Sequence, residues 1–156
     1  MKTHTIEFEV QHEDTDMQGA AFNPKYLFWF DTATNAFLKS VGLHYGQLLS
    51  QYHYAYPVTE CGCQFINTMH YDRPVKVATS LTELKEHSFK LQHDIFSGDM
   101  LLGSGYEVRI WVRIDQPENN RRIVVVPIPE EMVLKLLEVS NSYQTGTYSE
   151  HDNLQD

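Results

Sequence analysis

The stretch Asp14-Thr15-Asp16-Met17-Gln18-Gly19-Ala20-Ala21-Phe22-Asn23-Pro24-Lys25-Tyr26 joins an acidic turn to a helix-start signal. Asn23 is a favoured N-cap residue and Pro24 a favoured first helical residue, so we expect a helix over Tyr26 to Val41. A helix N-terminus offers free backbone N–H groups and the positive end of a dipole, which stabilise negative charge. A carboxylate beside it is suited to acyl transfer, because one group attacks or activates water while the other stabilises the oxyanion.

The residues around this stretch predict a strand before the helix and burial of the helix itself. Ile6, Phe8 and Val10 alternate with acidic residues, as in a half-buried strand. Along the helix, apolar residues recur every three or four positions, and residues 27–29 make its first turns apolar nearly all round. This pattern predicts burial on several sides. Gly42 predicts the C-terminal end of the helix.

The rest of the chain predicts a run of antiparallel strands. A short helical or irregular piece is expected at 45–51, strands at 58–66, 75–81, 89–95, 106–114 and 123–126, and a final short helix from 129. The fold class is therefore α+β, with an antiparallel sheet curled around one long helix. We expect a single domain over residues 1–139 and a polar, disordered tail over 140–156. One helix cannot cover both faces of such a sheet, so we expect a homo-oligomer.

Composition excludes several classes of partner. The formal net charge of −9 over 156 residues disfavours nucleic acid and anionic membrane. Cys61 and Cys63 are spaced too closely on a strand to bridge each other, and no second cysteine pair completes a zinc site. The first residues lack the apolar core of a signal peptide. These features predict a cytoplasmic protein with free thiols, no metal and no cofactor.

The order strand, D-x-D-x-x-G, N-P-x-Y, helix resembles the hotdog-fold acyl-CoA thioesterases of the 4-hydroxybenzoyl-CoA thioesterase family. Asp14 to Gly19 and Asn23 to Leu27 carry most of the resemblance, which covers residues 5–138. It implies dimers formed by pairing two sheets, often a dimer of dimers, with the pantetheine arm entering between subunits. It also implies that Asp16 is the catalytic carboxylate and that the backbone N–H of Asn23 polarises the thioester carbonyl.

The resemblance also suggests a substrate-binding set, drawn from the motif, the helix start and the middle strands. Its members are Gln18, Gly19, Phe22, Tyr26, Lys85, Ser88 and Lys90. Two positions depart from the family pattern. Ala20 stands where many relatives have a histidine, and only Lys85 keeps a firm charge in a segment where aryl-CoA relatives concentrate Arg and Lys. Lys90, Arg109 and Arg113 are the other candidates for contacts with the nucleotide phosphates.

Several alternatives stay open. Asp14 and Asp16 could serve only to form the turn through side chain to backbone bonds, and we expect this role for Asp14. A hotdog hydratase would carry a histidine five residues after its aspartate, where this chain has Ala21. A non-catalytic acyl-binding protein and a thioesterase for acyl-carrier proteins are the remaining readings. The favoured hypothesis is hydrolysis of an aryl or short-chain acyl-CoA, with Asp16 as nucleophile or general base.

Overall fold

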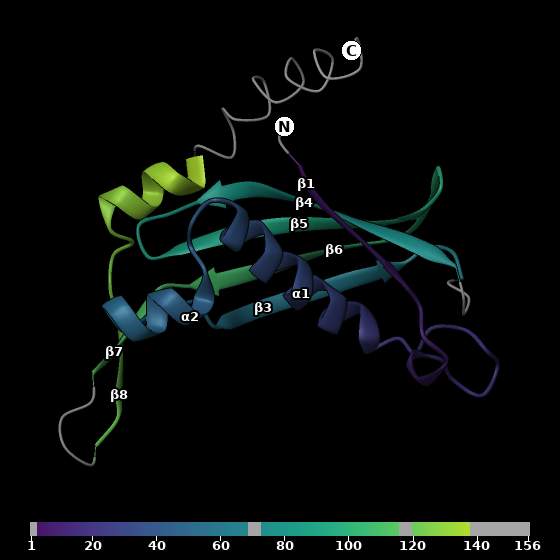
Figure 1. Ribbon diagram of the computed structural model, residues 1–156, viewed down its shortest axis with the longest axis horizontal. Helices are drawn as coiled ribbons and strands as arrows, with labels where there is room; N and C mark the ends of the chain where they lie inside the picture. The colour runs from purple at the N-terminus through teal and green to yellow at the C-terminus, as the bar shows by residue number, and fades with distance from the viewer. Residues whose placement is uncertain (1–2, 69–72, 116–119, 138–156) are drawn as a thin grey trace, which may run out of the picture.

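The computed structural model describes residues 3–68, 73–115 and 120–137. Figure 1 shows a five-stranded antiparallel sheet with the long helix α1 (Lys25–Ser40) lying across one of its faces. The strand order in this sheet is β1 (His4–Glu9), β4 (Pro74–Leu84), β5 (Ser88–Ser97), β6 (Met100–Ile110), β3 (Val58–Phe65). A smaller antiparallel sheet has the order β2 (Tyr54–Ala55), β7 (Val112–Asp115), β8 (Arg122–Val125).

Four short helical segments lie outside α1 in the described residues. A 3-10 turn, η1 (His12–Asp14), precedes it, while α2 (Tyr45–Gln47) and η2 (Leu48–Tyr52) follow it, and residues 130–137 form a last helix. The α+β class and the sheet curled around one helix are confirmed. Gly42 ends α1 as predicted: it has φ +80°, and its N–H donates to the Lys39 carbonyl at 3.1 Å. The predicted tail over 140–156 lies outside the described residues.

The predicted strand over 106–114 is wrong in its bounds. It consists of β6, which begins earlier at Met100, and β7, which belongs to the smaller sheet. The two strands separate at Trp111, which is completely buried and whose N–H donates to the His87 carbonyl at 2.7 Å. The alternation of apolar residues continues through the break. A pattern of alternating residues therefore cannot indicate that the chain changes sheets at Trp111.

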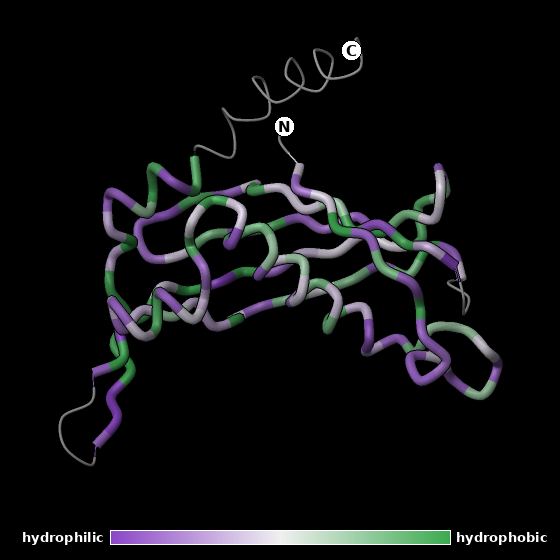
Figure 2. The backbone as a smooth tube through the Cα atoms, in the orientation of Figure 1, coloured by the Kyte–Doolittle hydropathy of each residue, from purple (hydrophilic) through white to green (hydrophobic). Residues whose placement is uncertain are grey.

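The face of α1 that contacts the sheet is strongly aromatic. Tyr26, Trp29, Phe30 and Phe37 are all buried, and Figure 2 shows the hydrophobic segments of the strands beneath the helix. Glycine in β6 makes the close approach possible, because a Cβ on Gly105 would collide with the ring of Phe30. The ring of Phe30 therefore packs directly against the backbone of β6 at this point.

The sequence predicts that the first turns of α1 are buried on several sides. In a single chain this prediction is wrong. Trp29 is buried, but Leu27 and Phe28 are 40% and 60% exposed. These two apolar side chains point away from the sheet that α1 covers. The strand β3 is likewise an edge of the large sheet, and most of its side chains are exposed. None of the helices in the described residues is long and apolar enough to cross a membrane.

Candidate active site

The carboxylate of Asp16 is held in the turn between η1 and α1. Its Oδ1 atom accepts the backbone N–H groups of Gln18 at 2.8 Å and Ala20 at 3.2 Å. The backbone of Asp16 closes the same turn, because its N–H donates to the Ala20 carbonyl at 2.8 Å. The other oxygen, Oδ2, has no hydrogen bond to any residue that the structure describes. One carboxylate oxygen therefore orients the group, and the second is available for chemistry.

Asp14 serves to build the turn, as predicted. It is buried, its Oδ2 accepts the Gln11 N–H at 3.0 Å, and its Oδ1 forms an ion pair with the Lys25 ammonium at 3.2 Å. Its carbonyl also accepts the N–H of Phe22 at 2.8 Å. These contacts tie the acidic turn to the first residue of α1. The turn therefore keeps a fixed position relative to the helix N-terminus.

The N-cap residue of α1 lies one position later than the sequence predicted, although the helix itself begins at Lys25, one position before the expected Tyr26. Pro24 is the N-cap residue, with φ −60° and ψ −20°, and Asn23 makes no side-chain capping hydrogen bond. The reason is a turn in which the N–H of Lys25 donates to the Phe22 carbonyl at 2.8 Å, so the chain is already wound at Pro24. The backbone N–H of Asn23 has no hydrogen-bond acceptor in the described part of the chain. A free donor thus stands at the start of α1.

A cavity of about 290 Å³ brings the central candidates together. Asp16, Asn23 and Tyr26 all line it. Tyr26 is buried, and its ring meets the edge of Phe65 at 4.8 Å between centroids. Burial, with a smaller effect of Cys63, raises the pKa of the Tyr26 hydroxyl, so it remains a neutral hydrogen-bonding group. The remaining lining residues are Ala20, Ala21, Phe65, Ile66, Asn67 and Thr68.

Four of these lining residues, Phe65 to Thr68, were not among the predicted site residues. Phe65 is the last residue of β3 and the other three follow it, and the chain is held there because the N–H groups of Ile66 and Asn67 both donate to the Leu102 carbonyl, at 2.9 and 3.0 Å. Nothing in the motif around Asp16 indicates this contact, because it depends on the pairing of β3 with β6.

The other predicted substrate-binding residues lie outside this cavity. Gln18 and Gly19 contribute to the exposed turn, where Gly19 has φ +77°, and Phe22 is 51% exposed. Lys85 is exposed between β4 and β5 and forms an ion pair with Glu83 at 3.4 Å. None of these side chains is among the residues that line the Asp16 cavity.

Ser88 and Lys90 lie toward the opposite end of the sheet. Ser88 pairs with Ile110, whereas the cavity residue Phe65 pairs with Gly103, seven positions away along β6. The ammonium of Lys90 lies over the ring of Tyr106 at 4.6 Å, on the outer face of the sheet. One chain by itself therefore does not bring these residues to Asp16.

A buried polar network beneath α1 was not predicted. Glu107 on β6 accepts hydrogen bonds at Oε1 from Thr34 at 3.0 Å, and the same oxygen lies 3.1 Å from Nε2 of His93. Its Oε2 pairs with Arg109, whose Nε lies at 2.7 Å. Arg109 Nη2 also reaches Asp31 of α1 at 2.7 Å. Arg109 was a candidate for phosphate contacts, but it is 5% exposed and committed to these partners, so that interpretation is wrong.

The network holds Glu107 ionised. Burial alone would raise the pKa of this carboxyl, but the hydrogen bond with His93 and the nearby Arg109 guanidinium hold the pKa below its usual value. An ionised Oε1 accepts, so Nε2 of His93 carries the proton in this contact. Nδ1 of His93 lies 2.8 Å from the hydroxyl of Thr79. The sequence contains only a weak signal of this network: Glu107 and Arg109 are two charged residues at alternate positions of one strand, and both face inward.

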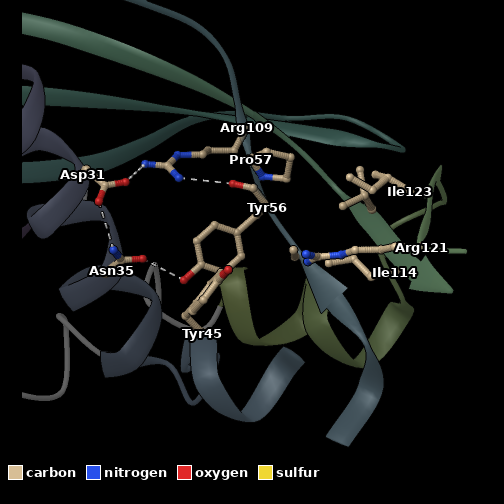
Figure 3. Close-up of a pocket in the computed structure, with 11 residues that line it drawn as sticks. Asp31, Asn35, Tyr45, Tyr56, Pro57, Arg109, Ile114, Arg121 and Ile123 are labelled. Carbon is tan, nitrogen blue, oxygen red and sulfur yellow. Dashed lines mark hydrogen bonds and ion pairs between the residues drawn. The ribbon is translucent and has the colours of Figure 1, made fainter. Parts of the chain in front are cut away.

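A second cavity, of about 440 Å³, lies beside the exposed end of this network (Figure 3). Asp31 and Asn35 of α1 form one wall, and Tyr56 joins them because its hydroxyl donates to Asn35 Oδ1 at 2.9 Å. Burial raises the pKa of Tyr56, which therefore stays protonated. Residues of the smaller sheet and Arg121 form the opposite wall. The cavity is lined by none of the residues that line the Asp16 cavity.

Comparison with known proteins identifies the family to which this fold belongs. The model of the thioesterase-like superfamily matches residues 10–136. A putative esterase of Aquifex aeolicus (strain VF5) is 25% identical over 126 residues, which cover 81% of this chain and 93% of the esterase. The 4-hydroxybenzoyl-CoA thioesterase of Pseudomonas sp. (strain CBS-3) is 22% identical over 136 residues, covering 83% and 94%.

Among solved structures, that of a gentisyl-coenzyme A thioesterase superposes with a TM-score of 0.73 at 29% identity. The superposition covers 85% of this chain and 98% of that one. The matched family region contains the acidic turn, α1 and all of the strands from β2 onward. By its fold and by this match, the chain belongs to the thioesterase-like superfamily of hotdog-fold proteins.

Proposed function

We propose that this protein hydrolyses an acyl-CoA thioester, with an aryl or short-chain acyl group, to the free acid and CoA. The observation that carries the proposal is the juxtaposition of Asp16 and Asn23 at one cavity. Asp16 presents a carboxylate oriented through Oδ1, and Asn23 presents, at the start of α1, a backbone N–H that has no acceptor among the described residues. The names of the relatives, thioesterases for aromatic acyl-CoA substrates, support the same class of reaction.

In the proposed reaction the thioester carbonyl oxygen accepts the N–H of Asn23, and negative charge develops on it near the positive end of α1. Asp16 then either takes a proton from a water that attacks the carbonyl carbon or attacks that carbon itself, giving a mixed anhydride that water opens. In both routes the C–S bond breaks, a C–O bond to water forms, and the departing thiolate takes up a proton.

The two routes are separated by a single turnover in water enriched in oxygen-18. If Asp16 is the nucleophile and water opens the anhydride at the aspartyl carbonyl, the label enters the carboxylate of Asp16. A general base leaves Asp16 unlabelled and sends the heavy oxygen only to the free acid. Mass spectrometry of the peptide that contains Asp16 measures the difference.

The direct test is thiol release from aryl, short-chain and long-chain acyl-CoAs by wild type and by Asp16→Asn. The amide preserves the size of the side chain, and its oxygen can still accept the N–H groups of Gln18 and Ala20, so the turn should survive. We expect at least a hundredfold loss of kcat with unchanged circular dichroism. Asp99→Asn, in the turn after β5, is the matched control and should keep full activity. Equal activity of Asp16→Asn and wild type would refute the assignment.

We further propose that the active unit is a homodimer or a homotetramer in which β3 pairs with β3 of a second copy. The support is that β3 is an edge strand of the large sheet with mostly exposed side chains, and that Phe28 of α1 is also exposed. In such an assembly Lys85, Ser88 and Lys90 could reach the CoA held at Asp16 only from another subunit. Light scattering after size exclusion measures the mass, and a strictly monomeric active enzyme would exclude this assembly.

The alternative functions make different predictions in the same assay. A thioesterase for acyl-carrier proteins would release no thiol from CoA esters but would cleave acyl groups from a loaded carrier. A non-catalytic acyl-binding protein would cleave neither. The oriented Asp16 carboxylate favours the catalytic readings over the binding one, because a site that only binds acyl groups does not need it.

A further inference from the structure

The second cavity has hydrogen-bonding groups that the protein itself leaves unused. Asp31 and Arg109 are bound to each other, and Asn35 is bound to Tyr56, so these four side chains are largely satisfied. Arg121 has no ion pair or hydrogen bond with any described residue. A volume of about 440 Å³ falls within the range of roughly 300–1,000 Å³ that is typical of small-molecule sites. The cavity is therefore large enough for a ligand, and its cation, Arg121, has no partner among the residues that the structure describes.

The free groups are both hydrogen-bond donors. Figure 3 shows the guanidinium of Arg121 directed across the cavity toward the hydroxyl of Tyr45. That hydroxyl has no hydrogen bond within the described chain, and the ring of Tyr45 is held edge-on against Tyr56 at 5.6 Å. A guanidinium and a phenol facing one space would bind an acceptor, and a carboxylate most strongly, because charge-assisted hydrogen bonds are roughly twice as strong as neutral ones.

The remaining walls are apolar. Ala55, Val112 and Ile114 form a small core cluster whose side chains also line the cavity, and Ile123 borders it while 64% exposed. An aromatic or aliphatic body would cover these side chains and remove Ile123 from water. The complementary ligand therefore has an apolar body and a hydrogen-bond acceptor at its far end.

The strand β3 connects the two cavities. Tyr56 and Pro57, just before its first residue, line the second cavity, while Phe65, its last residue, lines the Asp16 cavity. In an antiparallel pair the beginning of one strand lies beside the end of the other. If β3 pairs with its copy across a two-fold axis, each Asp16 cavity lies next to the second cavity of the partner subunit. An acyl group whose thioester is at Asp16 would then extend into that second cavity.

We propose that Arg121, assisted by Tyr45, is a specificity-determining residue that selects acyl groups with a carboxylate at the end distant from the thioester. The inference rests on the proposed function and on the pairing of β3. It assigns the second cavity to the acyl group of a substrate bound at the partner's Asp16. The preferred substrate is accordingly the mono-CoA thioester of an aromatic or short dicarboxylic acid.

The test compares kcat/KM for benzoyl-CoA and for its 4-carboxy derivative. In wild type we expect the carboxylated substrate to be preferred. In Arg121→Gln the ratio of the two kcat/KM values should fall roughly tenfold or more, because the charge-assisted bond to the distant carboxylate is lost. Arg122→Gln is the matched control, since Arg122 is the next residue, is also exposed and does not line the cavity. An unchanged ratio in Arg121→Gln would overturn the proposal.

A mixing experiment tests whether the two cavities act across subunits. Chains carrying Asp16→Asn and chains carrying Arg121→Gln are unfolded together, refolded and assayed with the carboxylated substrate. A hybrid dimer contains one site with both Asp16 and Arg121 intact only if these residues come from different subunits. Activity above that of refolded Arg121→Gln alone supports the proposal, and no gain refutes it.

A direct measurement of binding tests this inference independently of the proposed catalytic function. Calorimetric titration with terephthalate and with benzoate uses the free acids, so it does not require turnover. Tighter binding of terephthalate that is lost in Arg121→Gln supports the second cavity even if no thioester is cleaved. Equal binding of the two acids by wild type would overturn it even if the enzyme proves to be a thioesterase.

Discussion

Replacing Glu107 by glutamine should strongly destabilise the fold. Glu107 is 2% exposed, and its two oxygens contact Thr34, His93 and Arg109. The amide keeps the shape but removes the charge, and its NH₂ group must face either Arg109 or the donors on the other side. Arg109 then remains buried with only Asp31 as counter-ion. Breaking a buried ion pair on one side costs about 3–5 kcal/mol, so the free energy of unfolding should fall by about that amount.

Urea titrations followed by circular dichroism, at one fixed protein concentration, measure this loss. Glu83→Gln is the matched control, because Glu83 pairs with Lys85 on the surface at 3.4 Å and both side chains are about half exposed or more. An exposed pair of this kind contributes about 0–1 kcal/mol. If Glu107→Gln unfolds within about 1 kcal/mol of wild type with the same dependence on urea, the network does not support the fold as argued.

Glu107→Gln should also change how the stability of the protein depends on pH in the acidic range. The pKa of Glu107 in the folded protein is below its usual value, so the stability that it contributes is present above that usual value. This stability is lost as the pH falls from the usual pKa of a glutamate carboxyl through the lower pKa of Glu107 in the folded protein. Wild type should therefore lose stability over this acidic range, and Glu107→Gln should lose less. Parallel acid profiles for the two proteins would contradict the assignment of the ionised state.

Three smaller perturbations can be measured in the same urea titrations. Gly105→Ala should destabilise by about 1–3 kcal/mol, because the added Cβ would collide with Phe30 and lie 2.5 Å from a neighbouring carbonyl oxygen. Tyr56→Phe should lose about 0.5–1.5 kcal/mol with its hydrogen bond to Asn35, and no loss would mean that water replaces it fully. Gly42→Ala should lower the free energy of unfolding by about 1–2 kcal/mol because of the positive φ alone, since the nearest atom to the new Cβ, Nζ of Lys135, lies at 3.8 Å. An unchanged stability would show that the end of the helix relaxes.

The elements that follow from local pattern were predictable from the sequence. The alternation in β1 and β5, the spacing of apolar residues in α1 and the position of Gly42 each specify local backbone geometry, and each is confirmed. The end of β6 at Trp111 was not predictable, because an alternating pattern is the same on both sides of a change of sheet. The exposure of Phe28 was missed for a related reason: amphipathicity shows which residues are apolar but not whether a single chain covers them.

The candidate site likewise has a part that was predictable from the sequence and a part that was not. Asp16, Asn23 and Tyr26 lie within one short segment, and the structure places them at one cavity as the motif suggested. Phe65 reaches that cavity only through strand pairing. In the network around Glu107, Arg109 is only two residues away, but the contacts with His93, Thr34 and Asp31 join residues 14 to 78 positions apart. No local pattern specifies contacts over such separations.

The long separations in this network have a consequence for how the chain avoids wrong structures. A slip of two residues between β5 and β6 would keep every inward-facing position inward, so hydrophobic burial alone would discriminate weakly against it. It would, however, move Glu107 of β6 away from His93 of β5. Such a misaligned sheet would keep the pair of Glu107 with Arg109, because both lie on β6, but would carry the desolvation cost of Glu107 without the hydrogen bond from His93. The network thus acts as a check on strand register, which rejects compact states that an entirely apolar interior would tolerate.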